Sequence, residues 1–134
     1  MEALIIDDDP FALAMTKKTV SDRIPRKQIR IFSSPKFALQ YLQTENDVQG
    51  KKTGRRGIIL TDLEMPDMDG FEFLDEFNQL PKAIRDKYTI FVLSSTTENF
   101  EMKRLYEKPS FEGFIPKPLT AGKLDHLLTQ IGAR

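Results

Sequence analysis

The chain has 134 residues, of which 40% are hydrophobic, and this is enough to bury the core of one domain. Its 20 basic and 20 acidic residues cancel, which argues against a general nucleic-acid or membrane surface. The absence of cysteine excludes a disulfide framework, and a single histidine, His126, excludes a zinc site built from several histidines. No apolar run approaches the roughly 18 residues of a membrane span. We therefore expect a soluble, cytoplasmic protein.

Short apolar runs alternate with helix-like segments along the whole chain. In chain order, the sequence predicts strand 3–6 and helix 11–20, strand 28–32 and helix 37–42, strand 57–60 and helix 71–80, strand 89–93 and helix 100–106, and strand 113–116 and helix 124–131. The strands are too short for helices, and the helices carry apolar residues at helical spacing.

One long polar connection interrupts this pattern between residues 43 and 57. It contains three glycines and the basic residues Lys51, Lys52, Arg55 and Arg56. A nucleic-acid contact is one interpretation of this cluster, but short runs of charge are more often solvated loops. We expect a loop.

Five repeats of strand and helix predict an α/β fold with a parallel sheet, right-handed crossovers and helices on both faces. In such doubly wound sheets, ligands bind outside the carboxyl ends of the strands. The residues that follow each strand are therefore the first place to look for a functional site.

Polar side chains follow four of the five predicted strands. They are Asp7, Asp8, Asp62, Ser94, Ser95 and Lys117. Each of them alone is explained by helix capping or by an ordinary turn. Their meeting at one edge of one sheet is what indicates a site.

These residue types suit phosphoryl chemistry. Three carboxylates at close range repel each other and favour a hard cation, Mg²⁺ or, in its place, Mn²⁺. One carboxylate remains available to attack phosphorus and form an acyl phosphate, while the lysine neutralises the phosphoryl oxygens. We expect Asp62 to be the nucleophile, because its strand is central and the turn that follows can wrap the transferred group.

Four motifs carry a resemblance to a known family: "LIIDDDP", "DLEMPDMDG", "FVLSSTT" and "GFIPKPLT". With them, the chain resembles the receiver domain of bacterial two-component response regulators, of the chemotaxis-regulator type, from Leu4 to about Ile131. The resemblance implies a flavodoxin-like fold with strand order 2-1-3-4-5 and a single receiver domain over residues 1–134. It also implies a phosphoacceptor and not an enzyme acting on other substrates.

The resemblance assigns roles to the acidic positions. Asp62 would accept a phosphoryl group from a sensor histidine kinase. Asp7 and Asp8 would hold Mg²⁺ together with Asp62 and the backbone carbonyl of Glu64. Asparagine is frequent at the position of Glu64, so its carboxylate adds negative charge beside the site.

Further roles concern the response to phosphorylation. Lys117 would pair with the phosphoryl group through a segment with a cis peptide to Pro118, and Phe114 would be the switch aromatic. Ser94 directly follows the apolar run and is our choice for the switch hydroxyl. Counting back from Lys117 favours Ser95 instead, unless the segment around residues 108–110 contains an extra residue.

The resemblance also implies partners. A sensor histidine kinase or a histidine phosphotransfer protein would supply phosphate, and a downstream protein would bind the surface of the fourth predicted helix, the fifth strand and the last helix. No nucleic-acid or membrane partner is expected. Only three residues follow Ile131, so we expect either a stand-alone regulator or a chain truncated at its carboxyl end.

Two rival functions fit part of the same pattern. A haloacid-dehalogenase-type phosphohydrolase also uses a strand-end aspartate, and Asp7-x-Asp9 matches its minimal pattern, but Pro10 departs from it and Asp62 would have no role. A receiver-like binding module that acts without phosphorylation is the second rival. The complete set of acids, hydroxyl and lysine argues against it.

Overall fold

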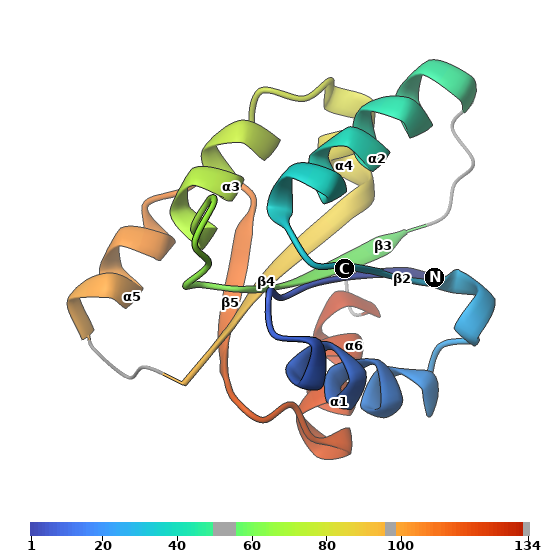
Figure 1. Cartoon of the computed structure of the whole chain (residues 1–134), viewed down its shortest axis with the longest axis vertical. Helices are drawn as coiled ribbons and strands as arrows, with labels where there is room; N and C mark the ends of the chain where they lie inside the picture. The colour runs from blue at the N-terminus through green and yellow to red at the C-terminus, as the bar shows by residue number, and fades with distance from the viewer. Residues whose placement is uncertain (50–55, 96–98, 133–134) are drawn as a thin grey trace.

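The computed structural model describes residues 1–49, 56–95 and 99–132, without the side chains of 45–49 and 99–102. Five parallel strands form one sheet in the order β2-β1-β3-β4-β5 (Figure 1). The strands are β1 (Glu2–Ile6), β2 (Ile29–Phe32), β3 (Gly57–Asp62), β4 (Tyr88–Ser94) and β5 (Phe111–Pro116). The predicted α/β fold, with flavodoxin-like strand order 2-1-3-4-5, is confirmed.

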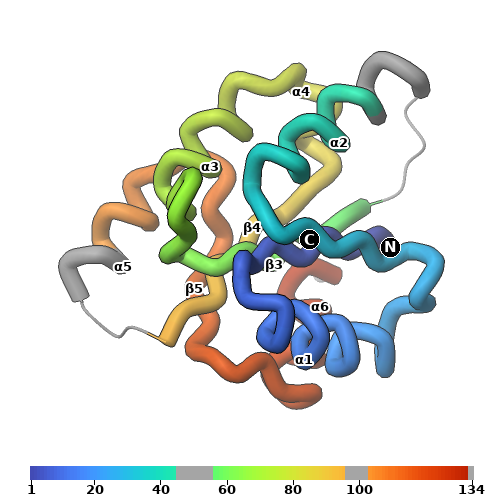
Figure 2. The backbone as a smooth tube through the Cα atoms, viewed as in Figure 1, coloured from blue at the N-terminus to red at the C-terminus, as the bar shows by residue number. Residues whose placement is uncertain are grey.

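Helices cover both faces of the sheet, as Figures 1 and 2 show. One face carries α1 (Pro10–Ser21) and α6 (Ala121–Gly132). The other face carries α2 (Pro35–Gln49), α3 (Gly70–Phe77), α4 (Lys82–Lys87) and α5 (Asn99–Tyr106). A short 3-10 helix, Arg26–Gln28, precedes β2.

Strand residues alternate between two apolar cores. In β1, Leu4 and Ile6 pack into the core under α2 to α5, whereas Ala3 and Ile5 pack into the core under α1 and α6. All four side chains are at most 1% exposed. Burying one large aliphatic side chain contributes about 1.5–3 kcal/mol, so a central strand buried on both faces is apolar at every position.

Helix caps place the segments that follow the strands. The Asp9 side chain accepts a hydrogen bond from the backbone N–H of Phe11 at the start of α1, with Pro10 in the first helical position. At α3, Asp69 and Glu72 form a reciprocal capping box. α1 therefore begins four residues after the end of β1 and α3 eight residues after the end of β3, and the acids between strand and helix stay at the sheet edge.

Some predicted boundaries were wrong. Residues 43–49 continue α2 and are not part of a loop. This stretch lacks an apolar stripe, but its glutamines and glutamate are good helix formers. Of the four basic residues noted above, Lys51, Lys52 and Arg55 lie outside the described residues, and Arg56 donates a hydrogen bond to the carbonyl of Ile131 at 3.2 Å.

Two short helical elements were not predicted. Residue 28 belongs to a 3-10 turn, so β2 begins one residue later than expected. Directly after the predicted helix 71–80, the carbonyl of Pro81 accepts hydrogen bonds from the N–H groups of Ile84 and Arg85 and starts α4. Elements of three and six residues are too short to display helical periodicity in the sequence. Among the described residues, no helix is both long and apolar enough to cross a membrane.

Candidate functional site

The candidate site lies at the carboxyl ends of β1, β3 and β5. Asp7 directly follows β1, Asp62 is the last residue of β3, and Lys117 directly follows β5. Asp7 is 5% exposed, and the side chain of Asp62 is 14% exposed. Parallel strands with right-handed crossovers bring these ends to one sheet edge, although the residues are 55 to 110 positions apart.

Lys117 bridges Asp7 and Asp62. Its Nζ lies 2.8 Å from Oδ2 of Asp7 and 3.1 Å from Oδ1 of Asp62. The backbone N–H of Asp9 donates to the other oxygen of Asp7 at 3.0 Å and fixes that carboxylate. The Lys117–Pro118 peptide bond is cis, as the resemblance implied.

The acids are close enough to share a cation. Asp7, Asp8 and Asp62 each offer a carboxylate oxygen within 4.8 Å of the others. Three carboxylates and one ammonium have a formal charge of −2, which one divalent ion balances. All the possible ligand atoms are carboxylate oxygens, and Asp8 is exposed to solvent. The arrangement therefore fits a hard cation that keeps part of its water shell.

The pKa shifts of Asp62 and Lys117 reflect the same excess of negative charge. Burial raises the pKa of Asp62, and Lys117 opposes this shift only in part, because its charge is shared with Asp7. Burial acts to lower the pKa of Lys117, but hydrogen bonds and charges from Asp7 and Asp62 outweigh it, so that its pKa is raised. The lysine therefore stays charged, while Asp62 sits among more negative charge than one ammonium can neutralise.

The two strand-end serines have different environments. Ser94 is 3% exposed at the end of β4, whereas Ser95 is exposed. The backbone N–H of Lys117 donates to the carbonyl of Ser94 at 3.0 Å, which joins these two strand ends. The register of β4 against β5 shifts by one residue, since Ile90 pairs with Phe111 and Phe91 with Gly113. β5 thus contains one extra residue, between Phe111 and Gly113.

With this geometry established, comparison with known proteins identifies the family. The family described as "Response regulator receiver domain" matches residues 3–129. The chain belongs to this family. Receiver domains are typically phosphoacceptors and not enzymes in their own right.

Relatives of this receiver domain occur in several bacteria. A response regulator receiver protein from Dyadobacter fermentans is 28% identical, with a TM-score of 0.81 and coverage of 97% of this chain and 96% of that one. The chemotaxis response regulator CheY4 of Vibrio cholerae is 21% identical, with a TM-score of 0.73 and 97% coverage of both chains, and shares the fold. The cyclic di-GMP phosphodiesterase response regulator RpfG of Xanthomonas campestris is 30% identical over 81 residues, which are 60% of this chain and only 19% of that protein.

Gly70 is a residue of this receiver domain that sequence reasoning missed. Its N–H donates to the carbonyl of Leu63 at 2.7 Å and closes the loop after Asp62. A Cβ at position 70 would lie 3.2 Å from Cα of Leu63 and 3.3 Å from the carbonyl oxygen of Asp62. Any other side chain would need the loop to give by a few tenths of an ångström, and the Asp-Gly pair in "DMDG" is the signal that could have found this position.

The other predicted site residues have different surroundings. Glu64 is exposed in the loop after Asp62. Asp9, the second acid of the hydrolase-like pattern, caps α1. Phe114 is partly buried and packs against the core under α2 to α5. It also lines a groove of about 490 Å³ between α5, β5 and α6, together with Tyr106 and others.

Proposed function

We propose that this receiver domain, in the cytoplasm, accepts a phosphoryl group on Asp62 from the phosphohistidine of a sensor kinase or a histidine phosphotransfer protein. The observation that carries this proposal is the convergence of the Asp7, Asp8 and Asp62 carboxylates within 4.8 Å. Lys117, hydrogen-bonded to Asp7 and ion-paired with Asp62, supports the same chemistry.

The transfer breaks one bond and forms another. A carboxylate oxygen of Asp62 attacks phosphorus, the bond from phosphorus to the imidazole nitrogen breaks, and its electron pair returns to the imidazole. The product is an acyl phosphate on Asp62. Lys117, already 3.1 Å from Asp62, would neutralise one phosphoryl oxygen.

The residues that would hold Mg²⁺ are Asp7, Asp8, Asp62 and, through its backbone carbonyl, Glu64. When bound, the ion would supply the positive charge that the cluster lacks and stabilise the charge on the transferring group. Asp7, held by the N–H of Asp9, and Asp62, at the end of a central strand, are both fixed by backbone structure.

Two residues would transmit the phosphorylation. Ser94, buried at the end of β4, is the proposed switch hydroxyl, and the extra residue within β5 supports it over Ser95. Phe114 is the proposed switch aromatic, because it lies on the neighbouring strand and lines the groove between α5 and α6. A downstream protein would bind the α5–β5–α6 surface, and the acyl phosphate would alter its affinity by shifting the packing of this surface.

An apolar surface beside the site supports a protein as phosphodonor. Phe11 is 73% exposed and Met15 is 51% exposed, four residues apart on one face of α1. Large exposed apolar side chains close to a charged centre are typical of a docking surface. Phe11→Ala should therefore slow phosphorylation by a kinase and leave phosphorylation by acetyl phosphate unchanged. Equal slowing by both donors would contradict a docking role.

The test of the proposed function is a mass measurement on the intact chain. The protein and Asp62→Asn are incubated with acetyl phosphate, with and without Mg²⁺. We expect the wild type to gain the mass of one phosphoryl group only with Mg²⁺, and the variant to gain none. No gain in the wild type, and no binding of beryllofluoride, would leave the phosphorylation-independent binding module as the better explanation.

A further inference from the structure

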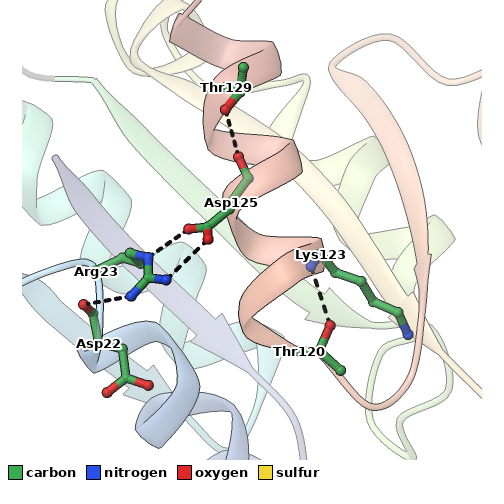
Figure 3. A network of polar contacts seen from close by, with 6 residues as sticks. All are labelled: Asp22, Arg23, Thr120, Lys123, Asp125 and Thr129. Atoms are coloured by element: carbon green, nitrogen blue, oxygen red, sulfur yellow. Dashed lines mark hydrogen bonds and ion pairs between the residues drawn. The ribbon is translucent and has the colours of Figure 1, made fainter.

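A second lysine, Lys123 in the first turn of α6, holds the segment that carries Lys117. Its ammonium donates hydrogen bonds to the carbonyls of Pro116 at 2.9 Å and Pro118 at 3.0 Å. These two residues flank Lys117 in the chain. Figure 3 shows the Lys123 side chain extending from α6 toward the segment that leads into the helix.

The same segment is tied to the rest of the fold on both sides. On one side, the N–H of Lys117 donates to the carbonyl of Ser94 at the end of β4. On the other side, the N–H of Lys123 donates to the hydroxyl of Thr120 at 3.2 Å, and Thr120 caps the start of α6. The backbone around Lys117 is therefore fixed by β4 before it and by α6 after it.

A lysine at position 123 is not explained by helix stability. The first turn of a helix has positive potential and favours acids over bases. Hydrogen bonds from an ammonium to carbonyls are charge-assisted and stronger than neutral ones. Contact with the two carbonyls compensates for the unfavourable helix position, so the residue serves the segment before the helix more than the helix itself.

We propose that Lys123 is a positioning residue for Lys117 and acts on phosphorylation without touching the phosphoryl group. By clamping the two carbonyls, it holds the backbone from which the Lys117 ammonium reaches Asp7 and Asp62. The inference rests on the proposed function, because it needs Asp62 to accept a phosphoryl group. It adds a residue of α6 to the machinery at the strand ends.

The test compares Lys123→Met and Lys123→Arg with the wild type. Lys27→Met, on an exposed lysine before β2 at the opposite end of the sheet, is the matched control for lost charge. Initial rates of phosphoryl uptake are measured by intact mass at saturating Mg²⁺ over a range of acetyl phosphate concentrations. Circular dichroism melts establish that each variant is folded at the assay temperature.

We expect Lys123→Met to lower the saturating rate about 10-fold, because small misplacement of a catalytic group has effects of this order or larger. The half-saturating acetyl phosphate concentration should change less than about twofold, because Lys123 does not bind the donor. Lys123→Arg should stay within about threefold of the wild type, since a guanidinium can also donate to both carbonyls. Lys27→Met should match the wild type.

A saturating rate for Lys123→Met equal to that of the wild type would overturn the inference and leave the proposed function intact. A rise in the half-saturating concentration alone would also overturn it, because that result indicates a long-range charge effect on the donor. If Lys123→Met is unfolded, Lys123→Gln replaces it and is judged by the same criteria. A wild type that takes up no phosphoryl group would instead reject the proposed function, and the inference with it.

Discussion

The two ends of the sheet both gather acidic side chains, with different results. At the amino-terminal end, Glu2 opens β1 and accepts hydrogen bonds from the hydroxyls of Tyr41 on α2, at 3.0 Å, and Tyr88 on β4. At the carboxyl-terminal end, Asp7 and Asp62 share the ammonium of Lys117. Each end thus joins residues from separate elements of the fold.

The difference lies in the balance of donors and charge. Glu2 has one carboxylate and two neutral donors, each on its own oxygen, and cations stack on both rings, Arg30 at 4.9 Å from Tyr41 and Lys87 at 5.1 Å from Tyr88. Both oxygens of Glu2 therefore have a hydrogen-bond donor within the protein, and these bonds connect α2 and β4 to β1. The other end has a formal charge of −2 and an Asp62 whose pKa is raised by burial, so a bound cation is needed to balance it.

Among the substitutions considered, removing the charge of Asp62 should change the melting temperature and the phosphoryl uptake most. Because its pKa is raised in the folded state, the folded protein holds this proton more tightly than the unfolded chain. Stability is therefore lost as pH rises from the ordinary value of 3.8 through the folded pKa. At neutral pH without Mg²⁺, Asp62→Asn should melt at a higher temperature than the wild type, while phosphoryl uptake is abolished.

With Mg²⁺ bound, the wild type should instead melt at a higher temperature than Asp62→Asn. At 100 times its dissociation constant, a ligand that binds only the folded state stabilises it by about 2.7 kcal/mol. Calorimetric melts with and without Mg²⁺ should show this gain in the wild type and much less in Asp62→Asn. Equal gains in both proteins would mean that Asp62 is not part of the metal site.

Gly57→Ala should disturb the packing at the amino-terminal end of the sheet and leave the carboxyl-terminal end unchanged. The new Cβ would lie 2.5 and 2.6 Å from Cε1 and Cδ1 of Tyr88, a buried ring held by Glu2. Overpacking of this kind costs about 1–3 kcal/mol, and the rigid ring puts the expected loss near the upper limit. Urea unfolding measures it, with Gly122→Ala as control, since a Cβ there meets nothing within 4 Å. The rate of phosphoryl uptake should not change.

Gly70→Ala should have a small effect on stability and a clear effect on the rate of phosphoryl uptake, the reverse of Gly57→Ala. Its Cβ would press on the backbone of Leu63 and Asp62, at 3.2 and 3.3 Å, and needs a shift of only a few tenths of an ångström. We expect a loss of about 1 kcal/mol in the free energy of unfolding. Because one of the displaced atoms belongs to Asp62, the proposed phosphoacceptor, uptake from acetyl phosphate should slow severalfold. A variant with reduced stability and an unchanged rate would show that the start of α3 does not position Asp62.

The smallest effect is expected at an exposed contact away from both ends. Arg23 donates from Nε and Nη2 to the two carboxylate oxygens of Asp125 and links α1 to α6, at 2.6 and 3.0 Å (Figure 3). The hydrogen bond and charge of Arg23 lower the pKa of Asp125, so this contact stabilises the protein above the ordinary pKa of the acid and is lost as pH falls.

Arg23→Gln should therefore lower the melting temperature slightly at neutral pH. The difference from the wild type should shrink in high salt and in acid, because exposed ion pairs are screened. Melts over a range of pH and salt concentration measure it. A large difference that survives high salt would give this exposed pair a role comparable to that of the two sheet ends.

Several features of the site were predictable from local sequence. Asp7, Asp62 and Lys117 each stand at the end of an apolar run, and the alternation of strands and helices requires those ends to meet. The helix cap at Asp9 can be read in the same way, from its place before Pro10. These inferences need only the period of the pattern and the handedness of the connections, which are properties of every L-polypeptide.

Other features depended on packing between distant segments. Neither the one-residue shift between β4 and β5 nor the burial of Ser94 can be read from a short stretch of sequence, so the choice between Ser94 and Ser95 stayed open. The carbonyl clamp of Lys123 gives no periodic signal, because it depends on where the chain turns before α6.

The sequence by itself determined the order of elements, the sheet edge that carries the acids and the identity of the three acids and the lysine. Only the tertiary structure decided the register of the strands, the depth of each side chain and the unequal charge balance of the two ends. Local patterns set which elements form, since they arise within a few residues. Distances between side chains far apart in the chain are set by the packing of whole elements, which no short stretch of sequence contains.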